Sequence, residues 1–276
     1  MKIFILLALS LVLTSADARK HARSRHLSTE DNNDIGSPSD NYPKLFTAGD
    51  FENHPAMNSS LDDFVQISNT MHKLPWRASF HTYVHIIAVA IKLVNASTVL
   101  EIGSYCGATI ALGLSVPSVR HFVAIDMRPN NSPPNTHDII RQNIEMFNVH
   151  NTTVDFIGGN SRDEHVRNAA FAVLPKHSVD VFFIDGDHFY PVPDFEYYQH
   201  LLRPGGLLIW DDFGGHPKVV FHVMNIALKN NDCFHIIGQL RNVAGANYLD
   251  NGAVASPVSN EFIMQKRWNC TNWWPK

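Results

Sequence analysis

The chain has 276 residues, of which 45% are hydrophobic and 17% are charged, and its formal net charge is −4. This length and composition are typical of a globular protein with one large domain. The mildly acidic balance gives no electrostatic reason to expect nucleic-acid binding, so nucleic acid is not an expected partner.

The first eighteen residues have the features of a secretory signal peptide. Lys2 gives a positive start, an apolar run follows at residues 3–14, and Ala16-Asp17-Ala18 fits a small-residue cleavage site. The apolar run is short for a membrane span, and a signal anchor is the alternative. We therefore expect a secreted or secretory-lumen protein with no stable membrane span after cleavage.

Glycosylation triplets and cysteines agree with this compartment. Five asparagines begin an Asn-X-Ser/Thr triplet and predict a glycoprotein; they are Asn58, Asn95, Asn130, Asn151 and Asn269. The odd number of cysteines leaves at least one thiol without an intramolecular partner. Cys106 lies in a glycine-bearing loop and is expected to stay reduced. Cys233 begins one late strand and Cys270 follows another, so we predict a disulfide between them.

Beyond the signal peptide, residues 19–45 are polar and predict a flexible leader. Residues 46–276 are expected to form a single domain. Helical spacing of apolar residues predicts helices at 61–74 and 80–94. Short apolar runs predict strands at 97–103, 121–126, 152–158, 179–185, 205–211, 233–240 and 260–266. Further helices are predicted between them at 108–116, 136–149, 163–174, 193–202 and 221–230. This alternation indicates an α/β fold whose parallel sheet is covered on both faces.

The loop after the first strand, VLEIGSYCGATI, has the features of a nucleoside-binding loop. Gly103 and Gly107 allow a sharp turn and a close approach to a ligand. Asp126 ends the second strand, where an acidic side chain accepts hydrogen bonds from ribose hydroxyls. The alternative is that both glycines only make a tight turn. The G-x-x-x-G spacing and the absence of a following lysine fit NAD and ATP poorly.

Five segments together resemble the class I S-adenosylmethionine-dependent methyltransferases: VLEIGSYCGATI, IDMRP, IGGNSRD, FFIDGDHFY and LLRPGGLLIWDD. The similarity is greatest to small-molecule O-methyltransferases, of the catechol type in the first loop and of the bacterial sugar type in DGDH…DD. It covers roughly residues 60–266. The resemblance implies a Rossmann-like, doubly wound, mostly parallel seven-stranded sheet with its last strand antiparallel. It also implies S-adenosylmethionine as the methyl donor.

The same resemblance implies which residues contact the donor. The methionine end would be lined by Glu101, Gly103, Tyr105 and Gly107. Asp126 would hold the ribose, and Met127 would pack on the adenine. The edge of the adenine ring would meet Gly159, Asn160 and Ser161, and Asp185 would also contact the donor.

Three aspartates follow two strands that should be neighbours, at ~5 Å spacing. Asp185 ends one strand, and Asp211 and Asp212 end the other. Carboxylates converging there would repel one another without a cation, and Mg²⁺ suits such oxygen ligands. Metal-dependent members of the family bind magnesium through matching acids. The alternative is that Asp185 only contacts the donor, while Asp211 and Asp212 cap the next helix.

The double aspartate departs from the catechol type, where an acid is followed by an amide. The sugar type has both aspartates, which favours an acceptor other than a simple catechol. A bound metal would lower the pKa of an acceptor hydroxyl, and a nearby side chain would take its proton. Asp187 is the predicted general base and His188 is its rival. The alternative for Asp187 is a helix cap.

Aromatic residues offer two candidate acceptor contacts, Trp76 with His81 and Phe189 with Tyr190, although such residues often only pack. The aromatic segment 268–275 is either a partner site or a tail packed on the sheet.

These observations predict an S-adenosylmethionine-dependent, Mg²⁺-dependent O-methyltransferase that acts on a small-molecule hydroxyl. The first alternative is a secreted binding or effector protein that uses the fold without catalysis, because the donor is made in the cytosol. The second is a hydroxylase or another oxidoreductase. The sequence disfavours it, because no His-His-carboxylate metal set is obvious.

Overall fold

The computed structural model describes residues 44–72, 85–127, 135–213, 216–240 and 261–270. Residues Tyr42–Lys276 form one compact unit. The predicted signal peptide and nearly all of the predicted leader lie outside the described residues, so both stay predictions. The compact unit begins a few residues before the predicted boundary at residue 46.

The centre of this unit is a seven-stranded sheet with the order β3-β2-β1-β4-β5-β7-β6. Its strands are β1 (Thr98–Ile102), β2 (His121–Asp126), β3 (Thr153–Gly158), β4 (Val179–Ile184), β5 (Leu202–Trp210), β6 (Phe234–Gly238) and β7 (Phe262–Lys266). Strands β1 to β5 pair in parallel, whereas β7 runs antiparallel to both β5 and β6. The predicted fold class, including the antiparallel last strand, is confirmed.

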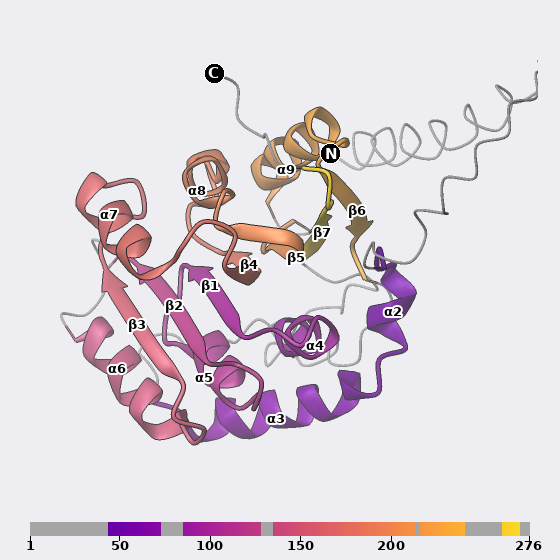
Figure 1. The fold of residues 1–276 in the computed structure, drawn as a ribbon. Coiled ribbons are helices and arrows are strands. Elements are labelled where there is room, and N and C mark those ends of the chain that lie inside the picture. The colour runs from indigo at the N-terminus through magenta and orange to yellow at the C-terminus, as the bar shows by residue number, and fades with distance from the viewer. Residues whose placement is uncertain (1–43, 73–84, 128–134, 214–215, 241–260, 271–276) are drawn as a thin grey trace, which may run out of the picture. The chain divides into compact units, whose positions relative to one another are not determined.

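Helices cover both faces of the sheet (Figure 1). One face carries α2 (Ala48–Glu52), α3 (Ala56–Thr70), α4 (His85–Leu93), α5 (Ala108–Leu114) and α6 (Thr136–Phe147). The other carries α7 (Glu164–Val173), α8 (Val192–Tyr198) and α9 (Pro217–Lys229). No helix within the described ranges has the length and apolar character that a bilayer crossing requires.

Several helices differ from their predicted bounds, among them α9, which begins at Pro217 instead of residue 221. Helix α3 begins at Ala56, earlier than the predicted start at residue 61. Helix α8 ends at Tyr198 instead of residue 202, because Leu202 already pairs with Val179 as the first residue of β5. A run of apolar residues that passes from a helix directly into a strand carries no signal for this boundary.

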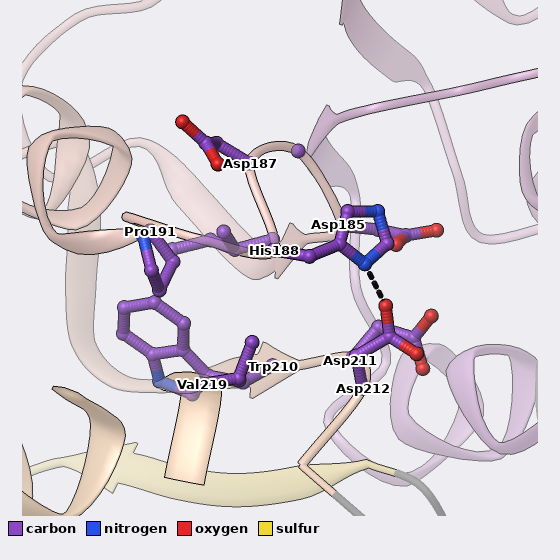
Figure 2. Close-up of a pocket in the computed structure, with 10 residues that line it drawn as sticks. Asp185, Asp187, His188, Pro191, Trp210, Asp211, Asp212 and Val219 are labelled. Atoms are coloured by element: carbon purple, nitrogen blue, oxygen red, sulfur yellow. Dashed lines mark ion pairs between the residues drawn. The ribbon is translucent and has the colours of Figure 1, made fainter. Parts of the chain in front are cut away.

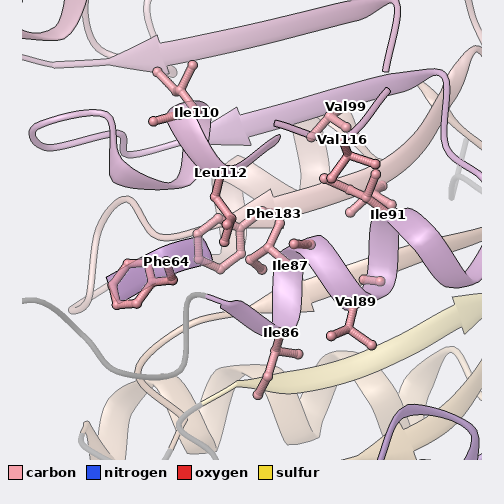
Figure 3. Packing of buried hydrophobic residues seen from close by; sticks show 14 of the residues in the cluster. Phe64, Ile86, Ile87, Val89, Ile91, Val99, Ile110, Leu112, Val116 and Phe183 are labelled. Carbon is pink, nitrogen blue, oxygen red and sulfur yellow. The ribbon is translucent and has the colours of Figure 1, made fainter. Parts of the chain in front are cut away.

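The apolar core has two parts, one on each face of the sheet, because successive strand residues point to opposite sides. In β4, Val181 and Phe183 pack with α2 to α6, whereas Phe182 and Ile184 pack with α7 to α9. Figure 3 shows Phe183 beside residues of α4, a helix with every residue from His85 to Ile91 buried. Burial on both faces explains why the central strands are nearly continuous apolar runs.

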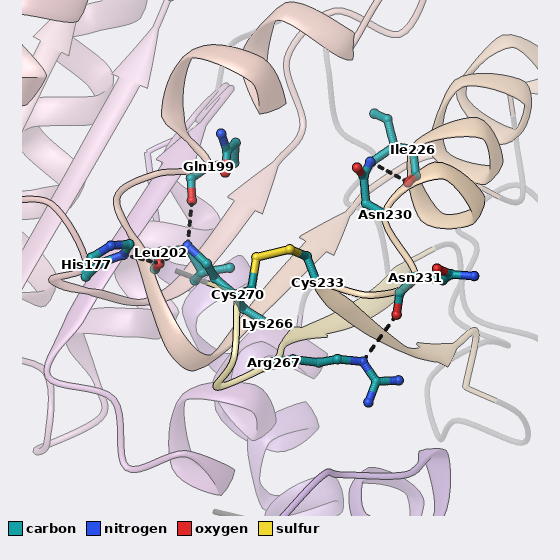
Figure 4. Close-up of a disulfide and its surroundings, with 10 residues drawn as sticks. All are labelled: His177, Gln199, Leu202, Ile226, Asn230, Asn231, Cys233, Lys266, Arg267 and Cys270. Atoms are coloured by element: carbon teal, nitrogen blue, oxygen red, sulfur yellow. Dashed lines mark hydrogen bonds between the residues drawn. A yellow bond between two sulfur atoms is a disulfide. The ribbon is translucent and has the colours of Figure 1, made fainter. Parts of the chain in front are cut away.

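A disulfide joins the segments that flank the two strands at the antiparallel end of the sheet. Cys233, just before β6, forms a disulfide with Cys270 after β7, which confirms the predicted pairing (Figure 4). Cys106 is buried and has a free thiol. Trp268 lies beside Gly205, so the first residue of the aromatic segment 268–275 contacts strand β5, while residues 271–275 lie outside the described residues.

Candidate active site

The topology creates a cleft where the direction of strand addition reverses. From β1 the chain adds β2 and β3 on one side, and later β4 and β5 on the other. Loops after β1 and β4 therefore diverge at the carboxyl edge of the sheet, which is where ligands bind in such folds. A cleft of about 510 Å³ lies there. Of the ten predicted donor-binding residues, eight line it: Gly103, Tyr105, Asp126, Met127, Gly159, Asn160, Ser161 and Asp185.

Gly103 brings the loop after β1 into direct backbone contact with the end of β4. Its φ is +91°, a conformation that favours glycine, and its amide donates to the carbonyl oxygen of Ile125 at 2.8 Å. A Cβ at this position would lie 2.0 Å from the carbonyl oxygen of Asp185. Gly107 also has a positive φ of +82°, but a Cβ there would make only ordinary contacts, the nearest at 3.7 Å.

Asp126 uses one carboxylate oxygen to hold this loop. Its Oδ2 accepts hydrogen bonds from the amides of Ser104 and Tyr105 at 2.8 and 3.0 Å. Its Oδ1 is buried and has no hydrogen-bond partner among the described residues, and Nε2 of His137 lies 3.7 Å away. Burial raises the pKa of Asp126. The arrangement leaves Oδ1, at the edge of the cleft, able to accept a hydrogen bond from a ligand hydroxyl.

The other two predicted donor-binding residues, Glu101 and Gly107, do not line the cleft. They contact or cap the loop after β1 instead. Glu101 is completely buried and accepts a hydrogen bond from the hydroxyl of Ser104 at 2.7 Å. Burial raises the pKa of Glu101 to about 8. Gly107 is the N-cap residue of α5. Both residues therefore shape the loop within the described structure.

The loop after β3 is tied to helix α8. The Ser161 hydroxyl donates to Oδ1 of the buried Asp194 at 2.5 Å, and the Tyr198 hydroxyl donates to the Ser161 carbonyl at 2.7 Å. Asn160 Oδ1 accepts from the amide of Arg162 at 3.0 Å. Asp194 and Arg162, which the sequence analysis did not single out, thus position the predicted adenine loop.

Met127 is 53% exposed at the rim of the cleft. Gly159 lies opposite the end of β2, where its amide donates to the carbonyl of Asp126 at 2.9 Å. These two residues border the side of the cleft on which the adenine was predicted to bind.

The three predicted metal ligands converge. Asp185, Asp211 and Asp212 each offer a carboxylate oxygen, and these oxygens lie within 4.8 Å of one another (Figure 2). The register Ile184↔Trp210 between β4 and β5 sets their positions. Burial, and then the charges of Asp211 and Asp212, raise the pKa of Asp185 well above its ordinary value.

This carboxylate group fits a hard divalent cation, which would remove the repulsion that raises the pKa of Asp185. The structure gives less support to the capping alternative. The N-cap residue of α9 is His216, whose own side chain makes no capping hydrogen bond.

The two candidate bases lie in different surroundings. Asp187 accepts hydrogen bonds from the amides of Phe189 and Tyr190 at 2.8 and 3.1 Å, and from Arg162 Nη2 at 2.7 Å. Burial alone would raise the pKa of Asp187, but these hydrogen bonds and the Arg162 charge hold it below its ordinary value. Figure 2 shows its carboxylate pointing away from the three clustered aspartates.

His188, by contrast, contacts the cluster. Its Nδ1 pairs with Oδ2 of Asp212 (Figure 2), and the hydrogen bond to Asp212 raises the pKa of His188. Of the two candidates, His188 is therefore the one beside the acidic group.

A second histidine, missed by the sequence analysis, also lies here. Nε2 of His216 is 3.9 Å from Oδ2 of Asp212, and the His216 and His188 ring centroids are 5.1 Å apart. A His-His-carboxylate group therefore exists, contrary to the expectation from the sequence. The two histidines are far apart in the chain, and only the pairing of β4 with β5 brings them together.

The predicted aromatic contacts are placed in part. Phe189 and Tyr190 are 66% and 49% exposed, and Phe189 lines the cleft. Trp76 and His81 lie outside the described residues.

Comparisons with known proteins agree with this architecture. Residues 100–213 match the family model described as "Methyltransferase domain". No curated protein matches the sequence. An O-methyltransferase from Bacillus cereus in complex with SAH is 20% identical, with a TM-score of 0.51 over 76% of this chain and 90% of that one.

Two other solved structures are similarly related. Cofactor-bound Rv0187 from MTB is 17% identical, with a TM-score of 0.52 over 76% of this chain and 91% of that one. The O-methyltransferase TomG from Streptomyces achromogenes, in complex with SAM, is 16% identical, with a TM-score of 0.50 over 77% of this chain and 90% of that one. These structures share the fold. The family match covers residues 100–213, so the similarity to a methyltransferase domain includes every residue that lines the cleft.

Proposed function

We propose that this protein is an S-adenosylmethionine-dependent methyltransferase that transfers the methyl group to a hydroxyl oxygen of a small molecule, with Mg²⁺ held by Asp185, Asp211 and Asp212. One observation carries the proposal: Asp185 belongs both to the carboxylate group and to the lining of the cleft predicted to bind the donor. The acidic group is thereby beside the position expected for the reactive methyl group. Two structural relatives, from Bacillus cereus and Streptomyces achromogenes, are O-methyltransferases, which supports oxygen as the acceptor atom.

The chain's own residues would place the donor. Oδ1 of Asp126 is buried at the cleft edge and would accept a hydrogen bond from a ribose hydroxyl. The Gly103 backbone allows close approach to the methionine end, and Ser161, held by Asp194, borders the adenine side. A fixed donor supports catalysis because methyl transfer needs the oxygen, carbon and sulfur nearly in line.

The carboxylate group would place the acceptor. A bound Mg²⁺ would supply Lewis acidity that lowers the pKa of the acceptor hydroxyl. We assign the proton-accepting role to His188, because its imidazole contacts Asp212 and Asp212 would stabilise the imidazolium. Asp187 would instead hold the loop 187–190 through the two amides and Arg162.

Asp211→Asn tests the proposal, because it removes one charge from the acidic group without enlarging the side chain. We expect S-adenosylhomocysteine to bind within about threefold of the unchanged chain, while Mg²⁺ binding and turnover are lost, with losses of the ~10²–10³ size known for electrostatic groups. Calorimetric titration measures both ligands, and methyl transfer is assayed on a panel of catechols and sugar hydroxyls.

Asp155→Asn is a matched control, because Asp155 lies in β3, outside the cleft lining, and pairs with His121. Unchanged Mg²⁺ binding in Asp211→Asn would contradict the metal assignment. A folded chain that does not bind S-adenosylhomocysteine would instead favour the non-catalytic alternative.

We further propose that the protein acts in or beyond the secretory pathway. The four described sequon asparagines are exposed, namely Asn58, Asn95, Asn151 and Asn269. The disulfide between Cys233 and Cys270 is typical of an oxidising compartment. Mass spectrometry of protein from secreting cells should find residues 1–18 removed and glycans on the sequons. A cytosolic, unmodified chain would contradict this.

A further inference from the structure

Two imidazoles converge on one carboxylate oxygen at the outer side of the acidic group. Nδ1 of His188 contacts Oδ2 of Asp212, and Nε2 of His216 lies 3.9 Å from the same oxygen. One ligand atom from each of the three residues falls within 4.8 Å of the others. His188 follows β4, Asp212 follows β5, and His216 is the N-cap of α9, so three elements build the group.

This convergence has no evident packing role. The two histidine side chains are 39% and 46% exposed, so their rings do not fill the core. One carboxylate oxygen therefore faces two imidazole nitrogens. A neutral imidazole has one nitrogen lone pair, and a metal ion can accept one such pair from each ring together with one from the carboxylate.

We propose that His188, Asp212 and His216 bind a borderline divalent metal ion such as Zn²⁺. Two imidazole nitrogens and one carboxylate oxygen are a common protein ligand set for zinc, with a further position left for water. The set differs from Asp185, Asp211 and Asp212, which offers only oxygen and suits Mg²⁺. The two sets share Asp212, so the site has a nitrogen-bearing face and an oxygen-bearing face.

Zinc binding at this site does not depend on whether the protein is a methyltransferase. The expected effect of zinc on turnover, however, rests on the proposed function. Zinc coordination occupies the His188 lone pair that the proposed reaction needs for proton acceptance. Zn²⁺ therefore inhibits methyl transfer even when Mg²⁺ is present, and a chelator selective for zinc restores it.

The test is a calorimetric titration of metal-free, full-length protein with Zn²⁺, without donor or acceptor, repeated with Co²⁺ while visible absorption is recorded. We expect His188→Ala and His216→Ala each to weaken Zn²⁺ binding at least about tenfold and to remove the cobalt absorption bands. His222→Ala is the matched control, since this partly buried histidine lies on the same helix but outside the group. S-adenosylhomocysteine binding and thermal unfolding verify that each variant is folded.

Asp211→Asn distinguishes the two proposed metal sites, because Asp211 belongs to the set of three carboxylates and not to the set that contains the histidines. It should abolish Mg²⁺ binding and leave Zn²⁺ affinity within about threefold. The inference is overturned if neither His188→Ala nor His216→Ala weakens Zn²⁺ binding. It is also overturned if Asp211→Asn weakens Zn²⁺ binding as much as the histidine variants do. Since no cosubstrate is present, zinc binding persists even where the methyltransferase assay fails, and the two proposals fail separately.

Discussion

Gly103 is the residue at which the donor loop and the strand bearing the acids touch. Because a Cβ would lie 2.0 Å from a backbone oxygen of Asp185, no rotamer change relieves the overlap. The left-handed conformation adds ~1–2 kcal/mol for any residue with a Cβ. Backbone shifts at this contact would displace the predicted donor loop and Asp185, a proposed metal ligand, together.

Gly103→Ala should therefore lower the free energy of unfolding by more than ~3 kcal/mol and abolish S-adenosylhomocysteine binding. Gly107→Ala has the same conformational penalty without the overlap, so its cost should stay near ~1–2 kcal/mol. Urea unfolding and calorimetry compare the two variants. Equal costs would show that the contact with Asp185 is unimportant.

Glu101 makes stability depend on pH. The folded-state pKa of about 8 exceeds the ordinary value of 4.5, so between these pH values the folded chain holds a proton that the unfolded chain has lost. The free energy of unfolding therefore falls as pH rises from about 4.5 to 8. At ~1.4 kcal/mol per pH unit, the loss amounts to roughly 3–5 kcal/mol.

Glu101→Gln cannot ionise and should flatten this fall, so that the variant is more stable than the unchanged chain at pH 8. Denaturant unfolding at pH 5 and pH 8 measures the difference. Glu164→Gln, at an exposed position in α7, is the control and should keep the original slope. A Glu101→Gln slope identical to the original would contradict the assignment.

At the scale of elements, strands were easier to predict than helix ends. Each central strand is an apolar run buried on both faces, and such a run is visible in a short segment of the sequence. Helix α2 was not anticipated, because its five residues are too few for a periodic pattern. Its start is fixed by Thr47 and Asp50, whose mutual hydrogen bonds form a capping box.

The candidate site residues also differ in how well the sequence predicts them. The aspartates at strand ends were predictable, because parallel strands deliver their carboxyl ends to one edge. The partner of Asp187 and the closeness of His216 to His188 were not, because they depend on how loops fold back after leaving that edge. Arg162 comes from the loop after β3, and nothing in its sequence neighbourhood indicates the ion pair with Asp187.

The disulfide joins the ends of the β6–β7 pair across a sequence separation of 37 residues. Replacing both Cys233 and Cys270 by serine should lower the free energy of unfolding by about 3–4 kcal/mol, mainly because the unfolded chain gains freedom. Cys106→Ala, which removes only a buried thiol, should cost much less. Unfolding of the oxidised chain, with and without reductant, tests this. A stability unaffected by reductant would rule out a structural role.

For the compact unit as a whole, the segment before α2 is part of the fold. The Phe46 amide donates to Oε1 of Gln265 at 2.8 Å, and the Phe46 carbonyl lies 2.9 Å from Nε2 of His235. Gln265 also donates to the Lys44 carbonyl at 3.3 Å. These contacts join the beginning of the unit to its last two strands.

A fragment of residues 42–276 should therefore be more stable than one of residues 47–276. The shorter fragment loses the Phe46 contacts and leaves the buried Gln265 partly unsatisfied, at a cost of ~1–3 kcal/mol. Thermal and urea unfolding of both fragments measure the difference. Coincident transitions would place the working boundary at residue 47.

The loop 187–190 has a consequence for how the protein could adapt. Asp187 and Arg162 hold its backbone by hydrogen bonds, whereas the side chains of Phe189 and Tyr190 are 66% and 49% exposed. These hydrogen bonds use only backbone atoms of residues 189 and 190. In the proposed enzyme, a library randomised at residues 189 and 190 would change the acceptors tolerated, while folding and donor binding stay constant. If the proposed function holds, substrate range is separable from stability here, and acceptor preference could diverge among descendants of this protein without compensating changes in the core.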